Sequence, residues 1–111
     1  MDLERPEQYQ FILTCDQREA EVVRAAIAQP AMQGAREDYE RAIAHEGLQR
    51  TLPPVADPWR VAVSAIELIA IHRATRNLQY RPQSGEEMRN SAAAFTAEIV
   101  ERGYEVKYYL A

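Results

Sequence analysis

Hydrophobic and polar residues alternate at both ends of the chain, and this pattern predicts a short strand at each end. In the segment 9–15 (YQFILTC), every second side chain is hydrophobic or aromatic, as on the buried face of a strand. A helix running from Pro6 is the alternative for this segment. The C-terminal segment 104–110 (YEVKYYL) has the same two-residue period and could pair with the first strand. Because two strands alone are marginally stable, we expect a second copy or a partner to complete the sheet.

Helical spacing of hydrophobic residues follows the first strand. A helix is predicted over 16–29, because Asp16 and Glu19 have the spacing of a capping box at its start. A second amphipathic helix is predicted over 36–47, and Gly47 is expected to close it.

A further helix is predicted near the C-terminus, with Ser84 and Glu87 as a capping box and Gly103 just past its last turn. Its expected inward side chains are Met88, Ala92, Phe95 and Ile99.

The segment 58–78 is predicted to form the third helix and is the most hydrophobic element. Asp57 is expected to cap it, and Pro58 suits a first helical turn. Between residues 65 and 71 the helix would be apolar around most of its circumference. Such a helix is either the central helix of the domain or the seam of an oligomer.

These elements predict an α+β fold that is predominantly α-helical, with about four helices, a central apolar third helix (58–78) and short N- and C-terminal strands. The length of 111 residues predicts a single compact domain, residues 1–111. The longest apolar run, 61–71, has 11 residues, against roughly 20 in a membrane span. The chain has one cysteine, Cys15, so we expect no internal disulfide and a cytoplasmic location.

The charge balance argues against one class of partner. The chain has 13 basic and 17 acidic residues, a net charge of −4. Nonspecific nucleic-acid binding rests on neutralising phosphates, and a net negative chain is poorly suited to it.

No group of residues in the sequence predicts catalysis, a metal or a cofactor. The soft or imidazole ligands His45, His72 and Cys15 fall on three separate predicted elements. Glu67 interrupts an apolar stretch, so it is either paired, with Arg60 for example, or an acid–base group with a raised pKa. Because no second acid or base accompanies it, we expect a protein that is not an enzyme.

The strongest candidate for a binding site follows the apolar part of the third helix. Arginine binds carboxylate and phosphate in a bidentate manner, and tyrosine offers a ring for stacking. The alternative is that the cations only offset the dipole at the helix C-terminus. The candidate residues are His72, Arg73, Arg76, Tyr80 and Arg81, with Lys107 and Tyr109 from the terminal strand.

Two functions are compatible with this site. The first is a small non-enzymatic protein-binding module that acts as an inhibitor, immunity or regulatory protein by occupying a protein partner. The second is a homo-oligomeric small-ligand binder that holds a phosphorylated or nucleotide-like anion at the arginines and Tyr80. Exposed arginine and tyrosine in one patch are typical of interface anchors, which favours the protein partner.

Overall fold

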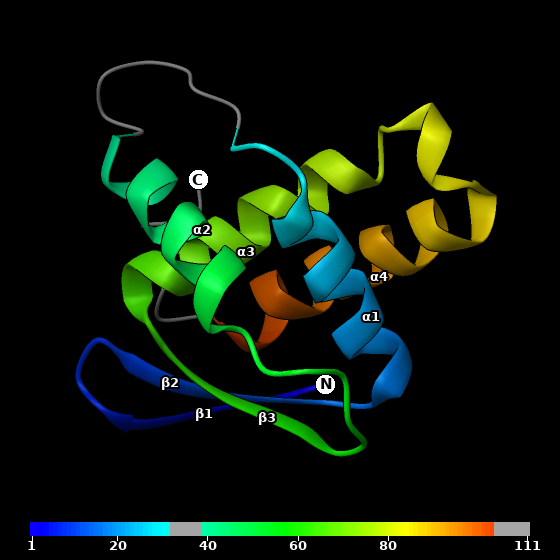
Figure 1. The fold of residues 1–111 in the computed structure, drawn as a ribbon. Coiled ribbons are helices and arrows are strands. Elements are labelled where there is room, and N and C mark those ends of the chain that lie inside the picture. Colours follow the sequence, from blue (N-terminus) through cyan, green and yellow to red (C-terminus); the bar gives the residue numbers. More distant parts are fainter. Residues whose placement is uncertain (32–38, 104–111) are drawn as a thin grey trace.

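A three-stranded antiparallel sheet, with helices packed on one of its faces, forms the architecture of the chain (Figure 1). The computed structural model describes residues 1–31 and 39–103. The expected α+β, predominantly helical fold is confirmed. In chain order, the elements are β1 Asp2–Glu7, β2 Gln10–Cys15, α1 Gln17–Ala28, α2 Tyr39–Thr51, β3 Trp59–Ser64, α3 Ala65–Leu78, the 3-10 helix η2 Pro82–Ser84, and α4 Glu86–Arg102.

The predicted N-terminal strand is β2, and it lies at the centre of the sheet between β1 and β3. Phe11, Leu13 and Cys15 are buried against the helices, as the alternation predicts. Tyr9 is instead exposed in the turn that joins β1 to β2, with a φ of 64°. Sequence analysis did not predict β1, because only Leu3 of this strand is even partly buried and no hydrophobic alternation marks it.

The prediction of a helix over all of 58–78 is wrong in its first part. Residues Trp59–Ser64 form β3, and the helix begins at Ala65. The strand has its own alternation, because Trp59, Val61 and Val63 lie opposite the three buried residues of β2. Burying these side chains on the sheet face stabilises the extended conformation over the helix that the Asp57–Pro58 pair indicated.

Ser64 begins α3 as its N-cap. Its hydroxyl accepts a hydrogen bond from the backbone N–H of Glu67, and a carboxylate oxygen of Glu67 accepts one from the backbone N–H of Ser64, at 2.8 Å. This capping box explains the carboxylate in the apolar stretch. Glu67 is therefore a structural residue at the start of α3, and its predicted pairing with Arg60 is replaced by this one.

The other helix ends agree with the sequence in part. The capping box of Asp16 and Glu19 at the start of α1 is present, and Gly103 follows α4 as predicted. Gly47 does not close α2, because the helix continues through it to Thr51. Ser84 does not cap α4, which begins after Gly85 and has no side-chain cap.

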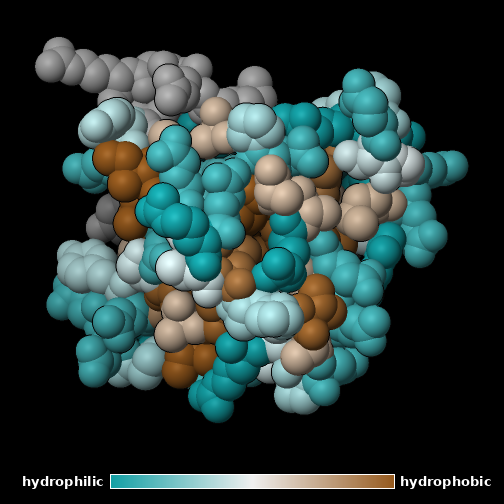
Figure 2. Space-filling model, viewed as in Figure 1, coloured by the Kyte–Doolittle hydropathy of each residue, from teal (hydrophilic) through white to brown (hydrophobic). Residues whose placement is uncertain are grey.

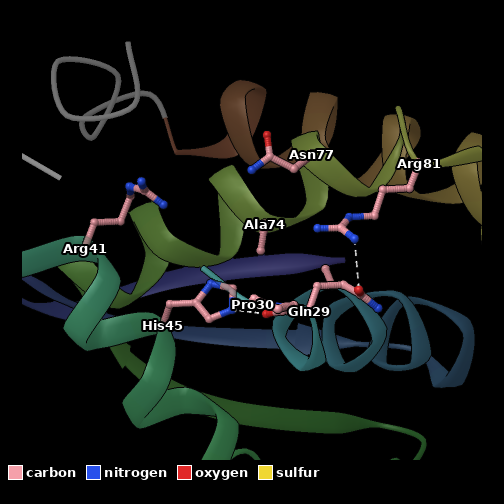
Figure 3. A pocket seen from close by; sticks show the side chains of 8 residues that line it. Gln29, Pro30, Arg41, His45, Ala74, Asn77 and Arg81 are labelled. Atoms are coloured by element: carbon pink, nitrogen blue, oxygen red, sulfur yellow. Dashed lines mark hydrogen bonds between the residues drawn. The ribbon is translucent and has the colours of Figure 1, made fainter. Parts of the chain in front are cut away.

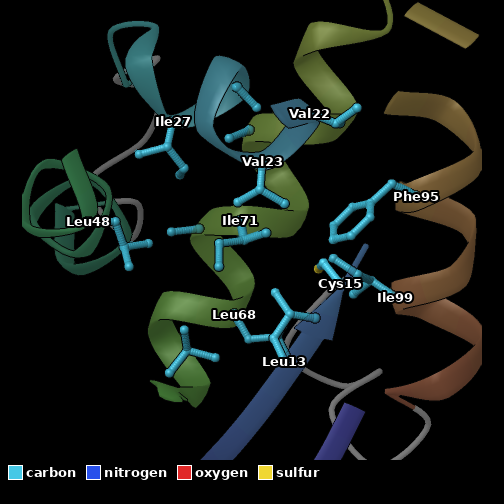
Figure 4. Close-up of a cluster of buried hydrophobic side chains, with 14 of the residues drawn as sticks. Leu13, Cys15, Val22, Val23, Ile27, Leu48, Leu68, Ile71, Phe95 and Ile99 are labelled. Atoms are coloured by element: carbon cyan, nitrogen blue, oxygen red, sulfur yellow. The ribbon is translucent and has the colours of Figure 1, made fainter. Parts of the chain in front are cut away.

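α3 is the central helix of this fold, within the bounds 65–78. Its buried side chains contact α1 and α2 on one side and α4 on the other (Figure 4). The apolar circumference is thus covered mainly by the chain's own elements. Around α3, the labelled core residues are Leu13, Cys15, Val22, Val23, Ile27, Leu48, Leu68, Ile71, Phe95 and Ile99.

The surface view agrees with this burial. Hydrophilic residues cover most of the face shown in Figure 2, and hydrophobic residues appear there as separate patches. In the described part of the chain, no helix is both long and apolar enough to span a bilayer. The predicted strand 104–110 lies outside the described residues.

Candidate functional site

The candidate residues of the described chain lie on the last two turns of α3 and on the turn after it. Backbone hydrogen bonds from Tyr80 to Asn77 and from Arg81 to Leu78, both 3.1 Å, continue the helix into a tight turn. This turn brings Arg81 next to the C-terminal end of α1. There, Arg81 Nη1 donates a hydrogen bond of 3.1 Å to Gln29 Oε1 (Figure 3).

His72 is buried, with 4% of its surface exposed. Burial lowers the pKa of its ring to about 4, and the positive charges of Arg76 and Arg73 act in the same direction. His72 is therefore neutral at pH 7. It supplies neither an exposed contact nor a positive charge to the predicted site.

Arg76 lies in the last turn of α3, Tyr80 follows four residues later in the turn that continues this helix, and both reach the surface. Arg76 is partly exposed, and Tyr80 is 75% exposed. Within residues 1–31 and 39–103, no carboxylate forms an ion pair with Arg76. We call these two residues the Arg76–Tyr80 patch. Arg73 is partly exposed one turn before it; Lys107 and Tyr109 lie outside the described residues.

Arg81 and Gln29 form a wall between two hollows that the sequence did not predict. On the α2 side is a small cavity of about 10 Å³, which is room for one water molecule. His45, which helps to line it, is buried, and its Nε2 lies 3.0 Å from Ile27 O and 2.7 Å from Gln29 O. Figure 3 shows His45 reaching toward the end of α1 from α2. This contact holds the last turn of α1 against α2.

On the α4 side of the same wall lies an open cleft of about 420 Å³, which we call the Arg81 cleft. It combines one cation with neutral polar and apolar side chains from four elements or their ends. No sequence pattern marks these residues as a group, because they come from helices that meet only in the folded chain. The cleft is lined by Ala25, Gln29, Leu78, Arg81, Gln83, Ser84 and Met88.

The structure also shows the surroundings of the residues that could act as a nucleophile or as metal ligands. Burial raises the pKa of the Cys15 thiol to about 12, with the negative charge of Glu19 adding to the effect, so the thiol is not ionised at neutral pH. In the described part of the chain, no three His, Cys, Asp or Glu side chains gather in a way that could hold a metal ion.

No protein-family model, curated protein or solved structure matches this chain. Its class is therefore defined by the fold described above: an α+β protein with a three-stranded antiparallel sheet covered on one face by helices.

Proposed function

We propose that this chain is a small non-enzymatic binding module that acts by occupying a protein partner, as inhibitor, immunity and regulatory proteins do. One observation carries the proposal: Tyr80 is 75% exposed and stands one helical turn beyond Arg76. Tyrosine and arginine are enriched among the anchors of protein interfaces. An exposed ring near an unpaired cation offers a partner both apolar contact and a charged hydrogen bond.

The charge of the Arg76–Tyr80 patch indicates the kind of partner surface. Arg76 has no acidic partner among the described residues, although the whole chain has a net charge of −4. A local positive site on a negative protein favours one docking orientation, because the rest of the surface repels an acidic partner. We therefore propose an acidic protein surface as the target. A cytoplasmic location is part of this proposal.

The test compares two exposed tyrosines. Tyr80→Ala removes the proposed anchor, and Tyr39→Ala is a matched control because Tyr39 on α2 is 70% exposed. Tagged proteins would be crosslinked in the source cells and the captured proteins identified. We expect a partner that the wild type and Tyr39→Ala retain and that Tyr80→Ala loses.

A second pair of variants tests the charge. Arg76→Glu should lose the same partner, whereas Arg60→Glu, at a side chain 63% exposed on the sheet, should keep it. Capture of no specific partner by the wild type, or equal capture by Tyr80→Ala, would contradict the proposal.

A small-ligand function is the second candidate, and the Arg81 cleft favours it. Its volume of about 420 Å³ is that of a small-molecule site. The predicted nucleotide-like anion is a poor fit to the described lining, because none of the described lining residues is aromatic and one of them, Arg81, is a cation. Native mass spectrometry of the purified chain would detect a bound ligand and any homo-oligomer.

A further inference from the structure

The volume of the Arg81 cleft, about 420 Å³, lies within the range of small-molecule sites. It opens between the C-terminal half of α1, the end of α3 and the start of α4. Pockets that bind small molecules have volumes of roughly 300–1,000 Å³, and they combine a mostly apolar lining with a few polar groups that orient the ligand. The composition of this lining therefore indicates what the cleft can hold.

The cation in the cleft is not neutralised by the described part of the chain. The hydrogen bond from Arg81 Nη1 goes to the neutral amide oxygen of Gln29, and no carboxylate of the described residues forms an ion pair with it. A guanidinium has five N–H donors, so most of its donors are left for water or for a ligand. A planar, bidentate anion such as a carboxylate matches this geometry.

The surroundings of Arg81 favour a single negative charge on the ligand. Among the described residues that line the cleft, Arg81 is the one that carries a charge. Beside the lining, Glu87 forms an ion pair with Arg18 at 3.4 Å, and Arg89 Nη1 donates a hydrogen bond to Pro82 O at 2.8 Å. A single guanidinium in the lining offsets one negative charge, so a monoanion matches the cleft better than a dianion such as a phosphate monoester.

The rest of the lining offers an apolar surface. Ala25, Leu78 and Met88 come from α1, α3 and α4 and are the hydrophobic members of the group. A methionine side chain adapts its shape to different ligands. The described lining residues include no aromatic side chain on which a nucleobase could stack.

We propose that the Arg81 cleft binds a small carboxylic acid with an apolar body. Arg81 holds the carboxylate, the side chains of Gln83 and Ser84 supply further polar contacts, and the apolar body packs against the partly exposed Ala25 and Met88. This site is separate from the Arg76–Tyr80 patch, because neither Arg76 nor Tyr80 lines the cleft. The ligand is a free acid, so the proposal does not depend on a protein partner.

The experiment compares ligands that differ only in the head group. The purified full chain would be titrated with 4-phenylbutyrate, 4-phenylbutanol and 4-phenylbutyl phosphate, with binding followed by calorimetry and by NMR shifts. We expect the acid to bind at least about tenfold more tightly than the alcohol, because its carboxylate accepts a charged hydrogen bond from Arg81 and the alcohol has no charge. Equal binding of acid and alcohol, or tighter binding of the phosphate, would overturn the proposal.

Variants then locate the site. Arg81→Gln should remove the preference for the acid over the alcohol, whereas Arg60→Gln on the sheet should leave it unchanged. Because Arg81→Gln also alters the contact with Gln29, Ala25→Leu serves as a second variant. It fills the cleft and retains Arg81, and should weaken the acid and the alcohol alike. If Ala25→Leu folds and binds both as the wild type does, the ligand lies elsewhere and the proposal fails.

Two further comparisons complete the test. The first distinguishes a free acid from the C-terminal carboxylate of a partner chain, and the second distinguishes the cleft proposal from the protein-partner proposal. An acetylated tripeptide ending in leucine that bound more tightly than 4-phenylbutyrate would overturn the assignment to a free acid, because it would place the carboxylate on a partner chain. Tyr80→Ala should bind 4-phenylbutyrate as the wild type does. The protein-partner proposal can therefore fail while the cleft proposal holds, and the reverse.

Discussion

At the scale of single residues, polar side chains in apolar surroundings have specific local reasons. Glu67 satisfies the backbone at the start of α3, where it accepts a hydrogen bond from Ser64 N at 2.8 Å. His72 is buried as a neutral ring beside two arginines. The sequence shows that such a polar residue lies within an apolar segment, but only the folded structure shows which group it contacts.

The buried His72 predicts a loss of stability in acid. The pKa of its ring is about 4 in the folded chain, against 6.5 for the ordinary value. Between these pH values the unfolded chain binds a proton that the folded chain does not, so the free energy of unfolding decreases as the pH falls from about 6.5 to about 4. The expected loss from this residue is about 3 kcal/mol over that range.

This prediction is checked by denaturant unfolding at pH 7 and pH 5 of the wild type and His72→Gln. The variant should lose less stability than the wild type between the two pH values, because it has no ring to protonate. An NMR titration in which His72 of the folded protein protonates near pH 6.5 would contradict the prediction.

At the scale of elements, the two edges of the sheet are short and protected. The backbone N–H of Ala65 donates to Tyr9 O at 2.9 Å, and from this register Trp59, Val61 and Val63 direct their backbone groups toward β2. Ser64, whose N–H faces the outer edge of β3, gives that N–H to Glu67. Pro58 precedes the strand, and Pro6 and an irregular register interrupt β1. These features limit further pairing at parts of both edges, and the second copy or partner that we expected to complete the sheet stays a prediction.

The start of α3 yields a prediction about helix capping. Ser64→Ala should lower the free energy of unfolding by about 1 kcal/mol, because it removes the hydroxyl that accepts from Glu67 N. Ser84→Ala is the matched control, since Ser84 precedes a helix with a glutamate three residues on but caps nothing. It should change stability by less than about 0.5 kcal/mol. Denaturant unfolding of both variants measures the difference, and equal effects would contradict the assignment of the cap.

At the scale of the whole molecule, one hydrophobic cluster joins the sheet to all four described helices. Its residues come from β2 and β3 on one side and from α1, α2 and α4 around α3. α3 contacts each of the three other α-helices as well as β2 and β3, and α1 also contacts α2, α4 and β2 directly. Damage to its buried side should therefore affect the whole fold rather than one end.

This arrangement predicts a large difference between two isoleucines on helices. Ile71 of α3 is fully buried, and Ile43 of α2 is 52% exposed. Ile71→Ala should lower the free energy of unfolding by about 2–5 kcal/mol, because it leaves a cavity in the core. Ile43→Ala, the same deletion at the surface, should cost less than about 1 kcal/mol. Denaturant or thermal unfolding checks both, and a small effect of Ile71→Ala would show that α3 is not central.

Sequence alone determined the parts of this protein that depend on neighbouring residues. The alternation over 10–15 and the capping box of Asp16 and Glu19 follow from the geometry of a strand or a helix, so they could be predicted. The α+β class follows from the same local patterns. The start of the third helix was placed wrongly, because Asp57 and Pro58 indicated a helix from residue 58, whereas the helix begins at Ala65 with Ser64 as its N-cap.

Tertiary structure decided what depends on contacts between distant residues. β1 is a strand because its backbone pairs with β2, and Trp59–Ser64 is a strand because its side chains are buried on the sheet; neither reason is local. Arg81 and Gln29 are 52 residues apart, and the wall they form exists only because α1 packs against the end of α3. The cleft beside this wall has no counterpart in the sequence, since packing alone brings its lining residues together.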